Sequence, residues 1–244
     1  MAHRSLSRRG PSPPVRPRPG RGDSAPARLA AGLATLVLVS FLAPFASAQV
    51  APPGPPLSIE ETEALVHARY FEAMPEEQAA RIGSEGAARL IEMLADPEER
   101  ESHQNVLLAL GICGAPGALE AISDWATEPR EGELDRATFK AWQVLPHALG
   151  RLAEHDPRAV ARLEAVFAED TPAWHFRQHR GPRLARLAQR GAASALAETG
   201  LPSAGRALGR VERRSSDPEL DAHLRAMRAR HGERARARAR ERVR

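Results

Sequence analysis

One repeated unit limits what this chain can fold into: an Ala/Leu-rich stretch that ends in glycine, followed by a turn that contains proline. The clearest copy runs from Leu107 to Gly111 and has its turn proline at Pro116. The corresponding prolines of the next copies are Pro157 and Pro202, at spacings of 41 and 45 residues. A period of about 40 to 47 residues is typical of stacked helical hairpins. The sequence therefore predicts antiparallel helix pairs and an all-α fold.

Helix-start signals divide the chain into these pairs. Asp-Pro dipeptides begin at Asp96, Asp156 and Asp217, where aspartate accepts from first-turn amides and proline fits the first helical position. Their spacings of 60 and 61 residues would mark every third helix, but the glycine and leucine positions favour a two-helix unit. Ser58 and Glu61 form a candidate capping box. We expect a helical domain over 58–231, with hairpins over about 96–128, 133–169 and 181–214.

Several glycines and one proline predict where the helices reverse, break or bend. Gly111 and Gly114 are expected to let the chain reverse after the first helix, and Gly83 and Gly86 to interrupt an earlier helical segment. Pro146 predicts a kink in the first helix of the second hairpin.

The first hairpin resembles the HEAT-repeat family, especially its bacterial HEAT-like members. The match consists of Asp96-Pro97, Ala109-Leu110-Gly111, Gly114 and Pro116-Gly117-Ala118-Leu119, whereas Ser102-His103 replaces the family's usual Val-Arg pair. The resemblance implies a short α-solenoid whose exposed row of helices binds a protein. Some HEAT-like proteins resemble the chromophore lyases of light-harvesting pigments (phycobilisome lyases). An accessory protein or subunit of an envelope enzyme is therefore the alternative function.

Residues 1–48 are expected to form a secretory signal. An arginine-rich stretch precedes an apolar run over 29–43, and Ala46-Ser47-Ala48 fits a signal-peptidase site. A membrane span needs about 20 apolar residues, which exceeds this run. We expect cleavage after Ala48 and a periplasmic or extracellular protein with a proline-rich linker over 49–57. The alternative is an uncleaved anchor at 29–43.

Charge is divided unevenly along the expected mature chain. Residues 49–170 hold 10 basic and 23 acidic side chains, whereas residues 171–244 hold 18 and 7. The net charge of +4 for the whole chain therefore conceals an acidic body and a basic end. Because Cys113 is the one cysteine, an internal disulfide is excluded and the core must hold the fold together.

The basic end finishes in an arginine-rich segment over 232–244. Arginines two positions apart wind around a helix and leave no apolar stripe, so we expect a solvated tail that is disordered at its end. If the protein is exported, such a tail favours anionic lipid, acidic polysaccharide or an acidic protein surface over nucleic acid. This gives a second alternative function, an electrostatic adaptor, beside a solvated tail with no ligand. The candidate residues are Arg234, Arg236, Arg238, Arg240, Arg242 and Arg244.

His175 and His179 are a histidine pair with a spacing that metal ligands use. On a helix they would share one face, with the carboxylates of residues 169–170 nearby. Two histidines do not complete a metal site, and the glutamate of a metalloprotease helix is missing. We therefore predict no metal, and expect Trp174 and Phe176 to anchor the segment while the histidines face solvent.

Other candidate residues have structural explanations. Cys113 lies in the turn of the first hairpin, where small buried thiols are common and no local pattern designates a base. Glu154, His155 and Asp156 are adjacent and point in different directions, and Asp156 is already a helix cap. Phosphate-binding glycine loops and Gly-x-Ser-x-Gly are missing from the sequence. The sequence thus predicts a non-enzymatic scaffold for an unknown protein partner, without cofactor or metal.

Overall fold

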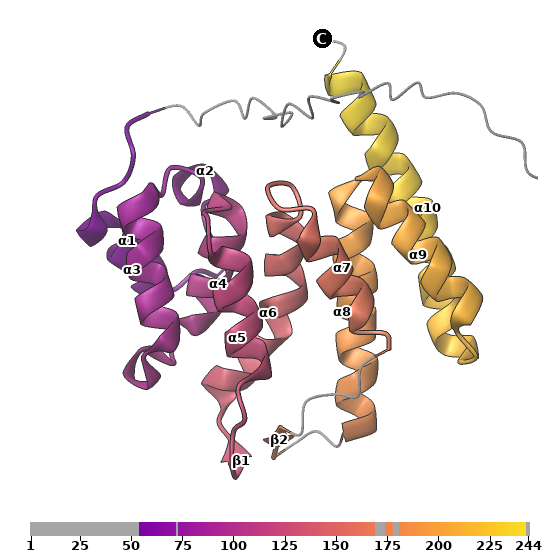
Figure 1. Cartoon of the computed structure of the whole chain (residues 1–244), viewed down its shortest axis with the longest axis horizontal. Helices are drawn as coiled ribbons and strands as arrows, with labels where there is room; N and C mark the ends of the chain where they lie inside the picture. The colour runs from indigo at the N-terminus through magenta and orange to yellow at the C-terminus, as the bar shows by residue number, and fades with distance from the viewer. Residues whose placement is uncertain (1–53, 72, 169–173, 178–180, 243–244) are drawn as a thin grey trace, which may run out of the picture. The chain divides into compact units, whose positions relative to one another are not determined.

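α-Helices make up most of the described chain, as the sequence predicts (Figure 1). The computed structural model describes residues 54–71, 73–168, 174–177 and 181–242, so the expected signal over 1–48 lies outside the described residues. No described helix is long and apolar enough to cross a membrane. The helices are α1 (Ile59–His67), α2 (Glu76–Ala79), α3 (Ser84–Ala95), α4 (His103–Cys113), α5 (Ala118–Thr127), α6 (Arg136–Leu152), α7 (Arg158–Ala165), α8 (Gly181–Thr199), α9 (Pro202–Arg214) and α10 (Pro218–Glu241). A 3₁₀ turn, η1 (Pro97–Glu99), and a parallel pair of short strands, β1 (Glu133–Leu134) and β2 (His175–Phe176), accompany them.

The first helices follow the predicted start signals, with one difference at a glycine. Ser58 and Glu61 form the expected capping box of α1: the Glu61 amide donates to Ser58 Oγ at 3.1 Å, and the Ser58 amide donates to Glu61 Oε2 at 2.8 Å. The prediction that Gly86 interrupts a helix is wrong, because Gly86 lies inside α3. A Cβ at this position would lie 2.7 Å from Thr62 Oγ1, so glycine allows α3 to lie against α1.

The end of the expected proline-rich linker is bonded to the helical domain. The Leu57 amide donates to the Arg81 carbonyl at 3.0 Å, and Arg81 Nε donates to the Pro55 carbonyl at 2.9 Å. Proline lacks an amide donor but keeps its carbonyl acceptor, so a proline-rich segment can still be held in this way. Residues 54–57 of the expected linker therefore contact the helical domain.

α4 begins later than the sequence predicts. Asp96 Oδ1 accepts from the Glu98 amide at 2.9 Å and starts η1, and the α-helix itself begins at His103. Ser102 and His103, the departure from the HEAT pattern, are both buried. This polar pair therefore needs hydrogen-bond partners inside the protein.

His103 connects α4 to the preceding loop and to α5. Trp125 Nε1 donates to His103 Nδ1 at 3.1 Å, and since an indole nitrogen only donates, Nδ1 must be unprotonated. His103 Nε2 then carries the proton and donates to the carbonyls of Met93 and Asp96, each at 3.1 Å. Burial lowers the pKa of His103. A second proton, on Nδ1, would also point at the N–H group of Trp125 and break that hydrogen bond. The ring is therefore neutral in the folded protein.

Alternate helices pack on each other: α4 on α6, α6 on α8 and α8 on α10 (Figure 1). Gly111 lies opposite Ala148, and Gly114 lies opposite His155. Because the residue numbers increase together on the two helices, α4 and α6 run parallel. The intervening helices α5, α7 and α9 return the chain between them.

The glycine of the Ala-Leu-Gly motif permits this packing. Gly111 was expected to help reverse the chain, but it lies inside α4, where a Cβ would be 2.4 Å from the Ala148 carbonyl oxygen. A Cβ on Gly150 of α6 would likewise lie 3.1 Å from Ala195 Cβ of α8. Chain reversal falls to Gly114, whose φ of 63° is in the left-handed region that favours glycine.

Gly111→Ala should destabilise the protein by about 1–3 kcal/mol, because the added methyl group overpacks a helix contact made by backbone atoms. Gly209→Ala is the matched control, since a Cβ there has its nearest contact with the flexible end of Arg213 at 3.5 Å. The control should be neutral or stabilising by up to about 1 kcal/mol, because alanine favours helices. Urea unfolding of the two variants and the parent measures the difference, and equal stabilities would contradict the packing argument.

Acidification should weaken the fold through His103. An unfolded histidine has a pKa of about 6.5, and the folded pKa is lower, so the unfolded state binds more protons as pH falls through this range. The free energy of unfolding should therefore fall as the pH drops below about 7, by at most about 1.4 kcal/mol per pH unit. Burial also lowers the pKa of His147, so His147 makes the free energy of unfolding fall with pH in the same way in the parent and in a His103→Gln variant. The difference between the parent and His103→Gln in urea unfolding should shrink on acidification, and a pH-independent difference would contradict the network.

Candidate functional site

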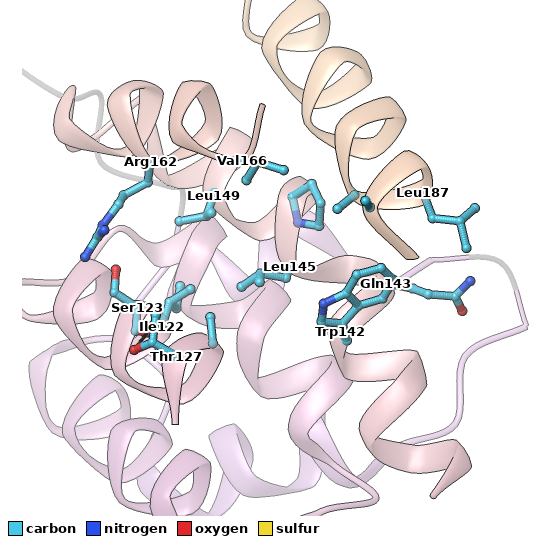
Figure 2. A pocket seen from close by; sticks show the side chains of 14 residues that line it. Ile122, Ser123, Thr127, Trp142, Gln143, Leu145, Leu149, Arg162, Val166 and Leu187 are labelled. Atoms are coloured by element: carbon cyan, nitrogen blue, oxygen red, sulfur yellow. Dashed lines mark hydrogen bonds between the residues drawn. The ribbon is translucent and has the colours of Figure 1, made fainter. Parts of the chain in front are cut away.

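An apolar pocket of about 200 Å³ lies where the α5–α6 region meets α7 and α8 (Figure 2). Ile122 and Ala126 of α5 form one wall, and Leu145 and Leu149 of α6 form another. Val166, just after α7, and Ala185, Leu187 and Ala188 of α8 complete the lining. Segments that are far apart in the sequence therefore build one apolar surface.

Polar groups border this pocket on the α5 and α7 sides. The Arg162 side chain extends from α7 toward the part of α5 that carries Ser123 and Thr127 (Figure 2). Arg162 is exposed, and no ion pair joins it to an acidic residue in the described ranges. Thr127 Oγ1 donates to the Ser123 carbonyl at 2.9 Å, which leaves its lone pairs free to accept. The border thus offers a positive charge and hydroxyl groups.

Trp142 supports the pocket wall and is itself held by other aromatic rings. Its ring lies 5.9 Å from Phe139, one turn earlier on α6, and 6.0 Å from Phe176 of β2. The neighbouring Trp174 is fixed because its Nε1 donates to the Glu128 carbonyl at 3.0 Å. The β1–β2 pairing therefore supplies rings that fix the orientation of Trp142.

Arg130 lies between two tryptophan rings at the base of this cluster. Its guanidinium carbon is 4.5 Å from the centre of the Trp125 ring and 4.4 Å from that of Trp174. Cations at this distance from an aromatic face are attracted to the ring quadrupole. Arg130 thus links α5 to the segment that carries β2.

Pro146 faces the pocket, and α6 continues through it as one element. Since proline has no amide hydrogen, the carbonyl of Trp142 lacks the helical donor that residue 146 would otherwise supply. The proline ring is accommodated at Gly191 of α8, where a Cβ would lie 3.0 Å from Pro146 Cγ. Pro146 and Gly191 together determine how closely α6 and α8 pack behind the pocket.

The chemistry available at this site is that of binding. Sites for small molecules and cofactors usually have volumes of about 300–1,000 Å³, so the pocket is small for them. Its lining is mostly apolar, and Arg162 is its one charged side chain. In the described residues no group of three or more His, Cys, Asp or Glu side chains is arranged to hold a metal ion. The pocket suits one or two apolar side chains with an anionic group beside them.

The structure does not bring the sequence-derived histidine pair onto a helix. His175 lies in β2 and is exposed, so the helical premise is wrong for it, and His179 and residues 169–170 lie outside the described residues. Trp174 and Phe176 are buried on either side, as expected. The residues predicted to anchor the segment therefore do so.

The remaining candidates have local partners. Burial raises the pKa of the Cys113 thiol, whose Sγ lies 3.7 Å from the Leu110 carbonyl, so the thiolate is disfavoured. Asp156 Oδ1 accepts from the Arg158 amide at 2.9 Å and acts as the predicted cap. The His155 ring covers Gly114. Cys113, Asp156 and His155 therefore have structural roles at the ends of helices or in the turns beside them.

The arginine-rich segment is helical, and part of it is bonded to neighbouring helices. α10 continues to Glu241, so the expected disorder does not reach the described residues up to 242, whereas the exposed Arg236 and Arg240 agree with a solvated segment. Arg230 pairs with Glu198 at 2.5 Å, and Arg238 Nη1 lies 2.8 Å from Glu154 Oε1 and 2.7 Å from the Thr199 carbonyl. Because residues four apart share a helix face, these arginines all face α8. Their ion pairs and their bonds to the last carbonyls of α8 hold α10 in place, although α10 has no apolar stripe in this segment. We call Arg230, Arg234 and Arg238 the inner arginines.

Other arginines of α10 face away from α8. Arg225, Arg236 and Arg240, which we call the outer arginines, are exposed and make no ion pair with a described acidic residue. Arg242 is exposed at the end of the helix, and Arg244 lies outside the described residues. Of the six candidate residues for an anionic partner, Arg234 and Arg238 therefore already have internal partners, at the Glu198 and Thr199 carbonyls.

Sequence reasoning did not identify the pocket. Pro146 predicts a kink, but Trp142, Leu145 and Arg162 belong to no motif. Their helices are adjacent only after folding, and a weak signal exists solely in Pro146, an apolar residue that a helix interior normally excludes.

Arg238→Gln should loosen the end of α10. Replacing the guanidinium removes bonds to Glu154 and the Thr199 carbonyl, and at this half-exposed site a loss of about 1 kcal/mol is expected. Amide hydrogen exchange in the last turns of α10 should become faster. Arg236→Gln, two residues away on the outer face, is the control and should leave both quantities unchanged. Similar exchange in the two variants would mean that the inner arginines do not hold α10.

The chain was also compared with known proteins. No protein-family model matches it, and no curated protein or solved structure shows significant similarity to it.

Proposed function

We propose that this chain is an exported, non-enzymatic scaffold whose HEAT-like helical hairpins form a short α-solenoid that binds a protein partner. The pairs α4–α5, α6–α7 and α8–α9 fit such an array. Between α6 and α8, Pro146 lies opposite Gly191 and Gly150 opposite Ala195, each at a separation of 45 residues. The equal offset at successive turns means that α6 and α8 run parallel, and the packing of α4 on α6 and of α6 on α8 fits stacked hairpins.

The pocket is the observation that carries the binding role. Protein interfaces depend on a few apolar anchors that fill well-packed pockets, and a pocket of about 200 Å³ on four helical segments provides such a place. In a stacked-hairpin array, neighbouring hairpins present one continuous surface, so a partner segment can cross several of them.

The border of the pocket indicates which partner segments fit. Arg162 would pair with a carboxylate, Thr127 would accept from a backbone amide of the partner, and Ser123 would accept from or donate to its backbone groups. A suitable segment carries a large apolar side chain with an aspartate or glutamate close to it. The chemistry of Arg162 thus adds a charge requirement to the apolar anchor.

A peptide-display library selected on the full chain tests this function. Selected peptides should share a Leu, Phe or Trp near an acidic residue. Ala126→Leu with Ala188→Leu fills the pocket and should reduce affinity by about 30-fold or more, the effect of losing a principal anchor. Arg162→Gln should weaken binding by about five- to tenfold, and loss of the peptide's carboxylate should have no further effect in that variant.

Control variants separate the pocket from the remaining surface. Ala226→Leu on the exposed side of α10 adds apolar volume outside the pocket, and Arg186→Gln removes an exposed, unpaired charge from α8. Both should leave affinity unchanged. If selected peptides bind the pocket-filled variant as well as the parent, or share no apolar anchor, the proposed binding role is wrong.

A further inference from the structure

We infer that the outer face of α10 docks onto a surface of anionic lipid headgroups. This site is separate from the pocket and does not depend on the proposed partner binding. The inference rests on the division of the α10 arginines into two sets by the fold.

The outer arginines form a line along one side of the helix. Arg225, Arg236 and Arg240 are separated by eleven and four residues, so at about 100° per residue they lie within about 60° of one another. At about 1.5 Å per residue the line is about 22 Å long. The charges are therefore presented along one direction and can meet a surface together.

This line keeps its charge because the fold provides no counterions for it. The inner arginines are matched by Glu198, Glu154 and the C-terminal carbonyls of α8. None of the outer arginines has an ion-pair partner among the described residues, and all three are exposed. Asp221, one turn before Arg225, and Glu233 lie on the same side of the helix, where neither forms an ion pair with an outer arginine, and together they lower the positive charge without cancelling it.

The residues between the outer arginines favour a flat, non-specific contact. Ala222 and Ala229 share this face and are small and exposed, so the helix can approach a plane closely. Apart from the arginines, the face has no aromatic, Asn or Gln side chain to stack on or read nucleic-acid bases. It also has no large apolar side chain to insert into a bilayer, so contact stays at the headgroups.

The position of α10 in the fold suits docking on a negative surface. Its main contacts are with α8 and α9, whereas residues 49–170, with 10 basic and 23 acidic side chains, form the helices up to α7. Approach through α10 therefore keeps the acidic residues away from the negative surface. Their repulsion from the surface is screened beyond a Debye length of about 8 Å at physiological salt.

Vesicle co-sedimentation with the full chain tests the inference. The protein should bind phosphatidylcholine vesicles that contain phosphatidylglycerol, and should bind less at high salt. Basic residues near an anionic membrane contribute about fivefold each, so Arg225→Gln/Arg236→Gln/Arg240→Gln should lower the partition coefficient by on the order of 100-fold. Unchanged helical circular dichroism verifies that the variant is folded.

Arg183→Gln/Arg186→Gln/Arg206→Gln is the matched control, because it removes the same charge from exposed arginines without described ion pairs. It should lower partitioning by less than about fivefold. All proteins carry the same arginine-rich stretch and apolar run within residues 1–48, so the contribution of that segment is common to the three proteins compared. Equal losses in the two triple variants, no preference for phosphatidylglycerol, or tighter binding to duplex DNA than to vesicles would overturn the inference.

Discussion

Contact between the backbones of parallel helices is the constraint on which the rest of this structure depends. Gly111 allows α6 to lie against α4 with no side chain between them, and Gly150 lets α6 lie against Ala195 of α8 in a less close contact. Dispersion forces act over short distances, so helices this close bury small residues efficiently. The aromatic cluster and the pocket occupy the remaining space beside this closely packed row. Their dimensions follow from how near the glycines let the helices come.

The parts of the fold that sequence reasoning predicted are those determined locally. The caps at Ser58 and Asp156 involve residues within three positions, so their side chains and the amides that they bind can be read together. The roles of Gly111 and His103 cannot be read from the sequence, because their partners, Ala148 and Trp125, lie on other helices. A glycine in a turn and a glycine at a helix contact look alike in a sequence. The pocket shares this limitation, because Arg162 faces α5 only after folding.

The arginines of α10 illustrate the same limitation for charge. Counting charges indicated a basic segment but not which charges are neutralised. Helical periodicity sorts the run into two faces, and Glu154, in the turn after α6, and Glu198 of α8 neutralise one of them. One compositionally uniform segment therefore both holds the last helix in place and leaves a separate line of charge. The two roles can be altered independently, since the arginines involved are different residues.

The positions of the tryptophans restrict what their fluorescence reports. The three tryptophans of the chain are Trp125, Trp142 and Trp174, and ring contacts through Phe176 join them into one group around α5, α6 and β2. α9 and α10 contain none. Emission from this protein therefore follows the environment of the middle helices, including the wall of the pocket at Trp142. Detachment of α10 would leave tryptophan emission unchanged. A single cooperative transition in fluorescence would therefore describe only the unfolding of the middle helices.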